Sequence, residues 1–232
     1  GFDTQISEAF YSTEQQPMLH FGLLGLIYGT FISTGMALVF ATCLGIGASI
    51  AICELAPRGL TAILVASVRL LASIPSVVFG LIGVVLVVPT LEALVVTPEL
   101  QIKYLAHFQL SGRGLLASTL VLTFMIVPII ITLTNDALLA VPKMYKEAGY
   151  AFGMTHMRVI FKIILPQAIS GIVASVILAA GRGIGEAIAV SMVCGGVGYI
   201  PDLSMGYAGL LAPILPLSSA IVNKSEAMGS TA

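Results

Sequence analysis

Charged residues are scarce in this sequence. Asp, Glu, Lys and Arg make up 9% of the 232 residues, while hydrophobic residues make up 58%. A water-soluble domain has about 25% charged and about 45–50% apolar residues, so the composition excludes an ordinary water-soluble globule. The net charge is −1 and no basic cluster is present, which argues against nucleic-acid binding.

Cysteine is also rare, and its spacing is uninformative. The three cysteines are Cys43, Cys53 and Cys194. They show no C-x-x-C spacing, so the sequence predicts neither a metal site nor a disulfide framework, and we expect them to be small core residues. The chain has no G-x-x-x-x-G-K-[ST] phosphate loop, and the glycines of residues 181–185 do not fit a dinucleotide fingerprint. We therefore expect no catalytic residue and no cofactor on this chain, with nucleotide chemistry on another subunit.

Long apolar runs dominate what is present. Residues 21–53, 70–91 and 114–135 contain no charged residue and are 33, 22 and 22 residues long. A helix needs about 20 apolar residues to cross a bilayer core. A fourth segment is apolar except for Arg182 and Glu186.

These runs predict four membrane-spanning helices. We place them at about residues 21–53, 61–91, 114–137 and 167–194. Barrel strands alternate polar and apolar residues over about 10 positions, whereas these runs are apolar on every side. Glycines recur within them, which favours close helix packing. The predicted fold class is an all-α polytopic transmembrane helix bundle, with a membrane domain over residues 21–194.

The basic residues predict the orientation. Cytoplasmic loops of this size collect Lys and Arg, so the more basic side is assigned to the cytoplasm. That side carries Arg58, Lys143, Lys146, Arg158 and Lys162, and the other carries Lys103, Arg113 and Lys224. Residues 1–20 are then extracytoplasmic, and so are residues 195–232, which we expect to form a tail or re-entrant segment. The start resembles no signal peptide, and we expect a preceding and a final helix to be missing.

The loop between the third and fourth spans differs in kind from the rest. Pro142 can open a helix, Gly153 can close it in the left-handed cap conformation, and Thr155 can cap a second helix that ends at Pro166. The second helix has apolar residues at helical spacing and a basic pair, Arg158 and Lys162. Residues 141–166 therefore predict a helix–glycine–helix element, with one face to bury and one to meet a partner.

The spacing in this loop resembles the EAA loop of ABC importer permeases, the binding-protein-dependent or MetI-like family. The matching residues are Glu147, Ala148, Gly149, Gly153, Ile163, Leu165 and Pro166. The family pattern has a second Ala where this chain has Gly149. The resemblance implies that the loop docks into a cleft of a separate ATPase subunit, with Glu147 in the contact segment and Gly153 setting the bend.

Two charges in the fourth span indicate a polar path. Arg182 and Glu186 lie four residues apart, on one face of the predicted helix. A central charge costs about 2.5–3.5 kcal/mol in lipid, so the pair is expected to face the bundle interior or a wet pathway. Arg182 can present a planar fork to an oxyanion while Glu186 holds it. A structural ion pair that locks helices together is the alternative.

Stretches over nearly the whole chain resemble the phosphate-specific permease of the Pst system, more its PstC type than its PstA type. They begin at Phe21, Ala51, Leu70 and Gly181. The resemblance places Arg69, Pro75 and Ser76 on the translocation path, and makes Arg182 and Glu186 the charged residues needed for phosphate passage. Arg69 can equally reach the cytoplasmic surface. Gly195-Gly196 stands where the family leads us to expect Gly-Asn.

The same resemblance implies the partners. They are a PstB-like ATPase that holds ATP and magnesium, a PstA-like second permease, an extracytoplasmic phosphate-binding protein and inorganic phosphate. A permease for sulfate, molybdate or another solute remains open, and so does an ion-coupled secondary transporter, which would need no docking loop. A membrane enzyme is disfavoured because His20, His107 and His156 lie in loops on both sides and cannot converge.

Overall fold

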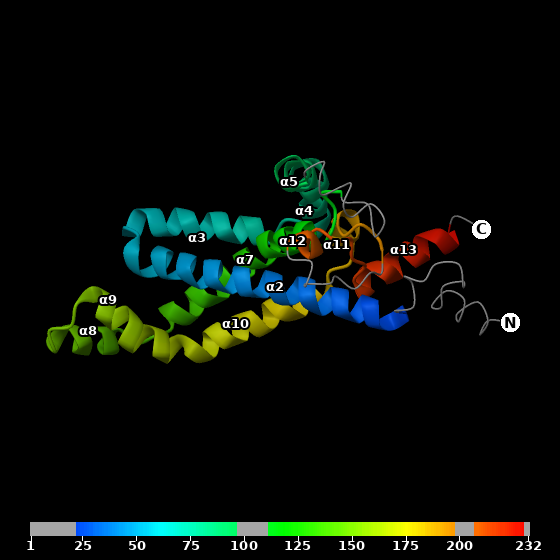
Figure 1. The fold of residues 1–232 in the computed structure, drawn as a ribbon. Coiled ribbons are helices and arrows are strands. Elements are labelled where there is room, and N and C mark those ends of the chain that lie inside the picture. Colours follow the sequence, from blue (N-terminus) through cyan, green and yellow to red (C-terminus); the bar gives the residue numbers. More distant parts are fainter. Residues whose placement is uncertain (1–21, 97–110, 198–206, 230–232) are drawn as a thin grey trace. The chain divides into compact units, whose positions relative to one another are not determined.

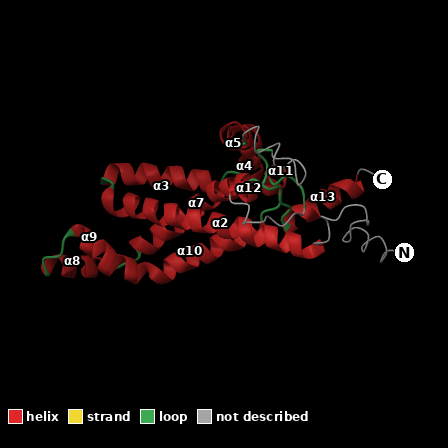
Figure 2. Cartoon of the chain, viewed as in Figure 1, coloured by secondary structure: helices red, strands yellow, loops and turns green. Residues whose placement is uncertain are grey.

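The computed structural model describes residues 22–96, 111–197 and 207–229, and its described elements are helices, joined by loops with one isolated bridge between Gly195 and Ile214 (Figure 2). The predicted all-α fold class is confirmed. The chain divides into two compact units. Residues 1–37, 75–122 and 184–232 form the first, and residues 38–74 and 123–183 form the second. The predicted extracytoplasmic segment 1–20, and with it His20, lies outside the described residues, as do Lys103 and His107.

Four helical stretches are long and apolar enough to cross a membrane, which is the number predicted. They are Leu24–Leu55, Ser76–Val95, Leu115–Leu139 and His156–Gly185. The first consists of α2 (Gly22–Ile50) and the short π-helix η1 (Ala51–Leu55), and the third is α7 (Leu115–Leu139). Their ends lie within three residues of the predicted 21–53 and 114–137.

The predicted second span, 61–91, is two separate helical segments. The short apolar helix α3 (Arg58–Ala72) ends at Ser73, and α4 (Ser76–Ile82) begins directly after Pro75. A proline disfavours the helical conformation of the residue before it, so the chain leaves the helix at Ile74. The spanning segment then continues through the π-helix η2 (Gly83–Val87) and α5 (Val88–Val95).

The predicted fourth span, 167–194, is displaced toward the N-terminus. A continuous helical segment runs through α9 (His156–Val159), the π-helix η3 (Ile160–Ile164) and α10 (Leu165–Gly185). The chain then leaves the helix, and α11 (Ile188–Val193) forms a separate short helix. The second helix of the predicted loop is therefore the beginning of the fourth span and does not end at Pro166.

Each π-helix in the described residues ends two positions before a proline. The three prolines are Pro57 after η1, Pro89 after η2 and Pro166 after η3. A proline inside a regular helix clashes with the carbonyl four residues earlier and removes one hydrogen bond. The wider π turn moves that carbonyl and re-pairs the backbone, which allows the helical segments at Pro89 and Pro166 to continue.

The second unit is held together along α7. Gly45 of α2 brings the two helices close, since a Cβ at this position would lie 2.6 Å from Ile130 Cγ2. The Ser49 hydroxyl donates to the carbonyl of Ile131 at 3.2 Å. One turn after Ile130 on α7, the Thr134 and Ser175 hydroxyls hydrogen-bond at 3.2 Å. The end of α2 turns into α3, and the two form a hairpin (Figure 1).

The first unit is packed around two glycines of the α4–η2 segment. A Cβ at Gly80 would lie 2.9 Å from the Cα of Ala189, and one at Gly83 would lie 2.7 Å from Val121 Cγ2. The buried apolar cluster of this unit is formed by Val88, Leu91, Ala117, Val121, Ala189 and Val193. The unit also contains α12 (Tyr207–Leu210) and α13 (Leu217–Gly229) from the predicted tail.

Candidate functional site

The predicted helix–glycine–helix element is present at one end of the second unit. α8 (Lys143–Ala151) begins directly after Pro142, and Gly153 has φ of +74°, the left-handed conformation that glycine adopts freely. The Gly153 N–H donates to the Tyr150 carbonyl at 2.9 Å, and the Met154 N–H donates to the Gly149 carbonyl at 3.1 Å. This pair of bonds is a Schellman cap, so the predicted left-handed closure is confirmed.

Gly149 is the point where α8 packs against the following helix. It is buried, and a Cβ there would lie 2.6 Å from Ile163 Cδ1 and 3.0 Å from Val159 Cγ2. The departure from the family pattern at this position therefore permits a close helix–helix approach. Ile163 is half-buried against the core cluster that contains Val159 and Ile164. Gly149 and Ile163 contribute to the internal shape of the loop.

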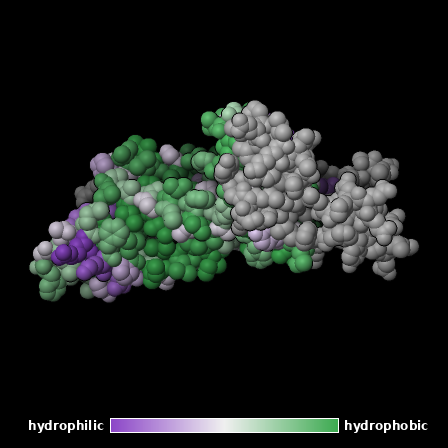
Figure 3. All heavy atoms as spheres, in the orientation of Figure 1, coloured by the Kyte–Doolittle hydropathy of each residue, from purple (hydrophilic) through white to green (hydrophobic). Residues whose placement is uncertain are grey.

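Three other motif residues are exposed on the outside of the element, and Leu165 is not. Glu147 and Ala148 are exposed on α8, Pro166 is exposed at the start of α10, and Leu165 is half-buried against the core cluster. Large apolar side chains are exposed around α8 as well: Met144, Tyr145, Phe152 and Met157. Hydrophilic residues gather at the α8–α9 end, beside the apolar surface of the neighbouring helices (Figure 3). This end thus presents a mixed polar and apolar surface.

A polar cluster that the sequence did not predict joins this element to the end of α2. Lys146 Nζ lies 2.6 Å from Glu54 Oε1. His156 Nε2 lies 3.0 Å from the Glu54 carbonyl oxygen, and the Tyr150 hydroxyl lies 2.6 Å from His156 Nδ1. The side chains of Tyr150 and His156 are also stacked, with 9° between their planes.

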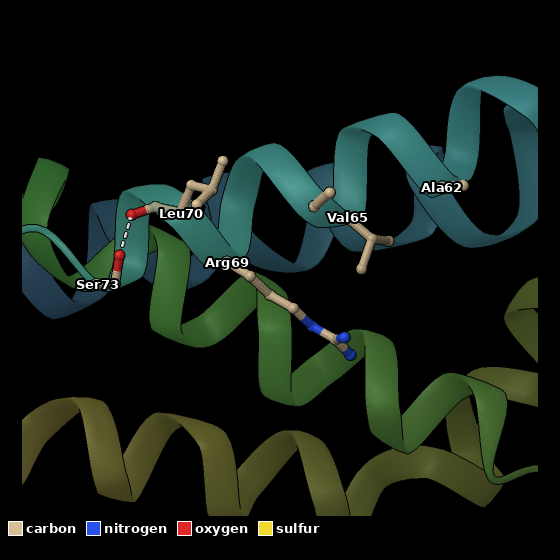
Figure 4. A pocket seen from close by; sticks show the side chains of 6 residues that line it. Ala62, Val65, Arg69, Leu70 and Ser73 are labelled. Carbon is tan, nitrogen blue, oxygen red and sulfur yellow. Dashed lines mark hydrogen bonds between the residues drawn. The ribbon is translucent and has the colours of Figure 1, made fainter.

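Arg69 lies beside an open groove along α3. The cavity measures about 730 Å³ and is lined by Ala62, Val65, Ala66, Arg69, Leu70 and Ser73. Figure 4 shows the Arg69 side chain reaching from α3 toward α7, where its guanidinium lies 3.6 Å from an Asp136 carboxylate oxygen. Both side chains are more than half exposed. The groove is therefore lined mainly by apolar side chains and by the guanidinium of Arg69, whose counter-ion Asp136 is exposed to solvent. Ser76, another predicted path residue, is half-buried and is the first residue of α4 and of the second spanning segment.

Glu186 does not form the expected helical pair with Arg182. Arg182 is exposed in the last turn of α10, but that helix ends at Gly185. Glu186 is 9% exposed, and its carboxylate accepts a hydrogen bond from the Ala189 N–H at 3.1 Å. In the described part of the chain, ion pairs are recorded for Arg69 with Asp136 and for Lys146 with Glu54. The expectation that the Arg182 and Glu186 side chains form an ion pair is therefore wrong.

The break after α10 is stabilised by the beginning of α13. The Ser218 hydroxyl donates to the carbonyl of Glu186 at 2.8 Å, and the Ser219 hydroxyl donates to the carbonyl of Ala187 at 3.2 Å. The Glu186 carboxylate and the Ser218 hydroxyl thus satisfy backbone groups at the helix break, while the Ser219 hydroxyl adds a second donor to the Ala187 carbonyl, which also accepts the Ser191 N–H at 3.0 Å. Non-helical backbone at membrane depth requires such internal partners.

These features define a class of protein: a multi-pass helical membrane protein in which α8 and a capped glycine turn lead directly into the fourth span. The chain matches the family model described as "Binding-protein-dependent transport system inner membrane component" over residues 41–215. That match covers more than half of the chain, so the protein belongs to this family of membrane transport components.

Two curated relatives illustrate the similarity. The chain is 36% identical over 200 residues to the probable ABC transporter permease protein YqgH of Bacillus subtilis, covering 85% of this chain and 60% of the relative. It is 35% identical over 237 residues to the phosphate transport system permease protein PstC of Mesorhizobium japonicum, covering 99% and 69%. The chain thus spans roughly two thirds of the length of these relatives.

A solved structure shares the fold. A chain of the MetNI methionine ABC transporter, in an inward-facing conformation, superposes with a TM-score of 0.60 over 92% of this chain and 91% of that chain. The two sequences are 22% identical, so this likeness concerns the fold alone. It agrees with the MetI-like architecture that the loop motif implies.

Proposed function

We propose that this chain is the permease subunit of an ATP-driven importer for inorganic phosphate. It would form part of the translocation path, and a separate ATPase subunit would hold ATP and magnesium. A second permease subunit and an extracytoplasmic phosphate-binding protein would complete the transporter. The resemblance to PstC-type permeases over most of the chain supports phosphate as the solute.

The geometry of α8 is the single observation that carries the proposal. The helix is fixed from within by Gly149 and capped by Gly153, while Glu147 and Ala148 remain exposed. A rigid, exposed helix can be gripped by a motor subunit and can transmit its displacement to membrane helices, whereas a flexible loop would absorb it. The exposed apolar residues Met144 and Phe152 add surface that a partner cleft can bury.

A charge reversal tests the docking role. Glu147→Arg should separate the ATPase from the membrane complex, because like-charge or unpaired contacts at an interface are costly. Glu147→Gln is the matched control, since it keeps the size and hydrogen-bonding oxygen of the side chain. Co-purification from membranes measures the outcome. Undiminished co-purification and phosphate uptake with Glu147→Arg would contradict the docking role.

The transport path is tested at Arg182. Reconstituted with the ATPase and the binding protein, the unmodified protein should import phosphate, and Arg182→Ala should abolish uptake while the complex still assembles. Arg182→Lys keeps the charge but not the planar fork, so it should retain only part of the uptake. Normal uptake by Arg182→Ala would remove the residue from the anion pathway. On the resemblance to PstC-type permeases, Arg69, Ser76 and Glu186 are proposed as further residues of the translocation path.

Solute competition separates the alternatives. Excess unlabelled phosphate should suppress uptake of labelled phosphate, whereas sulfate or molybdate should not. A permease for another oxyanion would show the reverse ranking. An ion-coupled secondary transporter would move its solute without the ATPase, so uptake that persists after the ATPase is omitted would overturn the importer proposal.

A further inference from the structure

The cluster around Glu54 is the contact between α8 and the α2–α3 hairpin. Glu54 lies in η1 at the end of α2, four positions before α3 begins. Lys146 and Tyr150 both come from α8, and His156 opens α9. Lys146 and His156 follow Glu54 by 92 and 102 positions in the sequence. Lys146 contacts the side-chain carboxylate of Glu54, and His156 contacts its backbone carbonyl.

The ion pair in this cluster is shielded from water. The Glu54 side chain is 7% exposed and that of Lys146 is 25% exposed, with a separation of 2.6 Å. A charge-assisted hydrogen bond of this length is about twice as strong as a neutral one, and burial reduces its screening by salt. By contrast, the Arg69–Asp136 pair is longer and more than half exposed on both sides.

The second contact fixes the orientation of α9 relative to the same residue. A carbonyl oxygen can only accept, so His156 Nε2 donates to the Glu54 carbonyl. In the neutral ring, Nδ1 then accepts a hydrogen bond from the Tyr150 hydroxyl, and the stacking of the two rings stabilises this arrangement. Glu54 therefore engages α8 through its side chain and α9 through its backbone.

Among the described residues, the apolar cluster around Ile160 and Ile164 includes no residue of α8, so it does not itself join α8 to the α2–α3 hairpin. Ile46, Ile50 and Cys53 of the α2–η1 segment pack against the cluster formed around Ile160 and Ile164, which belong to η3. Gly149 joins α8 to η3 in turn. The direct link from α8 to the hairpin is thus polar, and a single substitution can remove it while leaving the apolar core intact.

We propose that Glu54 and Lys146 form a strut that makes α8 move together with the α2–α3 hairpin. They are positioning residues: neither needs to touch the solute or the ATPase. Because α3 carries Arg69, displacement of α8 is passed to the helix that holds this guanidinium and its groove. The inference rests on the proposed importer function. Displacement of α8 would then reach the membrane helices by two routes: along the chain through α9 and η3 into α10, and through the ion pair into the α2–α3 hairpin.

The first experiment measures coupling in proteoliposomes that contain the full transporter. Phosphate uptake and ATP hydrolysis are recorded from the same vesicles for Glu54→Gln, Lys146→Met and the reversed pair Glu54→Lys with Lys146→Glu. Each single variant should keep the ATPase bound and hydrolysing, while phosphate moved per ATP falls about fivefold or more, the low end of measured site–site couplings. The reversed pair should recover most of this loss. Glu92→Gln, which neutralises an exposed carboxylate on α5, should leave the ratio unchanged.

A distance measurement tests the strut without any transported solute. Spin labels at Lys143 on α8 and Leu60 on α3, both exposed, report whether the two helices move together. Adding a non-hydrolysable ATP analogue should leave the distance distribution unchanged in the unmodified protein and should shift or broaden it in Glu54→Gln. An unchanged distribution in that variant, or an unchanged uptake ratio in both single variants, would overturn the strut. Absent phosphate uptake by the unmodified protein would instead contradict the proposed function.

Discussion

Position 149 allows a graded test of how α8 is held in place. A Cβ added to Gly149 would meet the ends of two side chains, Ile163 Cδ1 at 2.6 Å and Val159 Cγ2 at 3.0 Å. Moving Ile163 away from its preferred rotamer costs about 0.5–1.5 kcal/mol. Alanine gains about 1 kcal/mol over glycine inside a helix. For Gly149→Ala the two contributions nearly cancel, so we expect stability and transport close to those of the unmodified protein.

Gly149→Leu should behave differently, because the same space cannot accept three further carbon atoms. Overpacking of this kind costs about 1–3 kcal/mol. If α8 relieves the strain by detaching from η3, the free energy of local opening falls by the same amount. Amide hydrogen exchange of α8 in the assembled transporter should then accelerate about 5–150-fold. Mass spectrometry of peptides that cover residues 143–151 measures this rate.

A compensating substitution tests the geometric reasoning itself. Shortening the opposing side chain with Ile163→Ala in the Gly149→Leu background should return α8 exchange toward its original rate, since the added volume finds room. Ile163→Ala alone should open a small cavity and accelerate exchange less than Gly149→Leu does. If Gly149→Leu left the α8 exchange rate unaltered, or if Ile163→Ala made the double variant worse, the close approach at position 149 would not be what holds the helix.

Two further substitutions probe backbone features of the site. Gly153→Ala should destabilise the purified complex by about 1–2 kcal/mol, seen as a lower midpoint of thermal unfolding, because a residue with a Cβ is disfavoured in the left-handed conformation. Gly47→Ala, likewise without neighbours within 4 Å but in a regular helix, should not lower the midpoint, and equal losses would contradict this reasoning. Glu186→Ala should reduce uptake and cost about 1–3 kcal/mol, because the Ala189 N–H loses its buried acceptor. Glu186→Gln keeps an acceptor oxygen and should retain uptake. An equal loss of uptake in both variants would show that the negative charge is required, and not only the acceptor oxygen.

The loop was predictable because its determinants are local. Pro142, Gly153 and Thr155 act through the conformations of their own backbones and their immediate neighbours, so spacing along the sequence suffices to place the beginnings of the two helices and the end of the first. The apolar runs likewise predict four spans through length and composition alone. The break at Pro75 is also local, because a proline disfavours the helical conformation of the residue before it, although its consequence, a separate α3, also depends on where the preceding helix begins.

The break at Glu186 could not be recognised from spacing. Arg182 and Glu186 fit a helical ion pair four residues apart, and no proline follows to mark an end. The structure ends α10 at Gly185 and stabilises the free backbone with the hydroxyls of Ser218 and Ser219, more than 30 residues later. Gly185 was the available signal, since glycine commonly follows a helix end. It was obscured because glycine is also common within membrane helices.

The unpredicted polar contacts share one cause: their partners are distant in the sequence. Glu54 is the first charge after an apolar run, which by itself suggests only the end of a span. Its pairing with Lys146 depends on how the second unit folds, and so does the pairing of Arg69 with Asp136. A single sequence contains no signal that relates such positions. The residues that connect the loop to the membrane helices were therefore found only from the structure.

The residues of the loop motif are therefore different from those that we propose to select the solute. Of the motif positions, Gly149, Ile163 and Leu165 face inward and Gly153 sets a backbone turn, while Glu147 and Ala148 remain free for a partner. Most of the motif therefore specifies the internal shape of the α8–α9 element. Selectivity must reside elsewhere, and the accessible guanidinium groups outside the loop are suited to an anion. Under the proposed function, substitutions in the loop should accordingly change how much phosphate moves per ATP, whereas Arg182→Ala should abolish phosphate uptake while the ATPase stays bound.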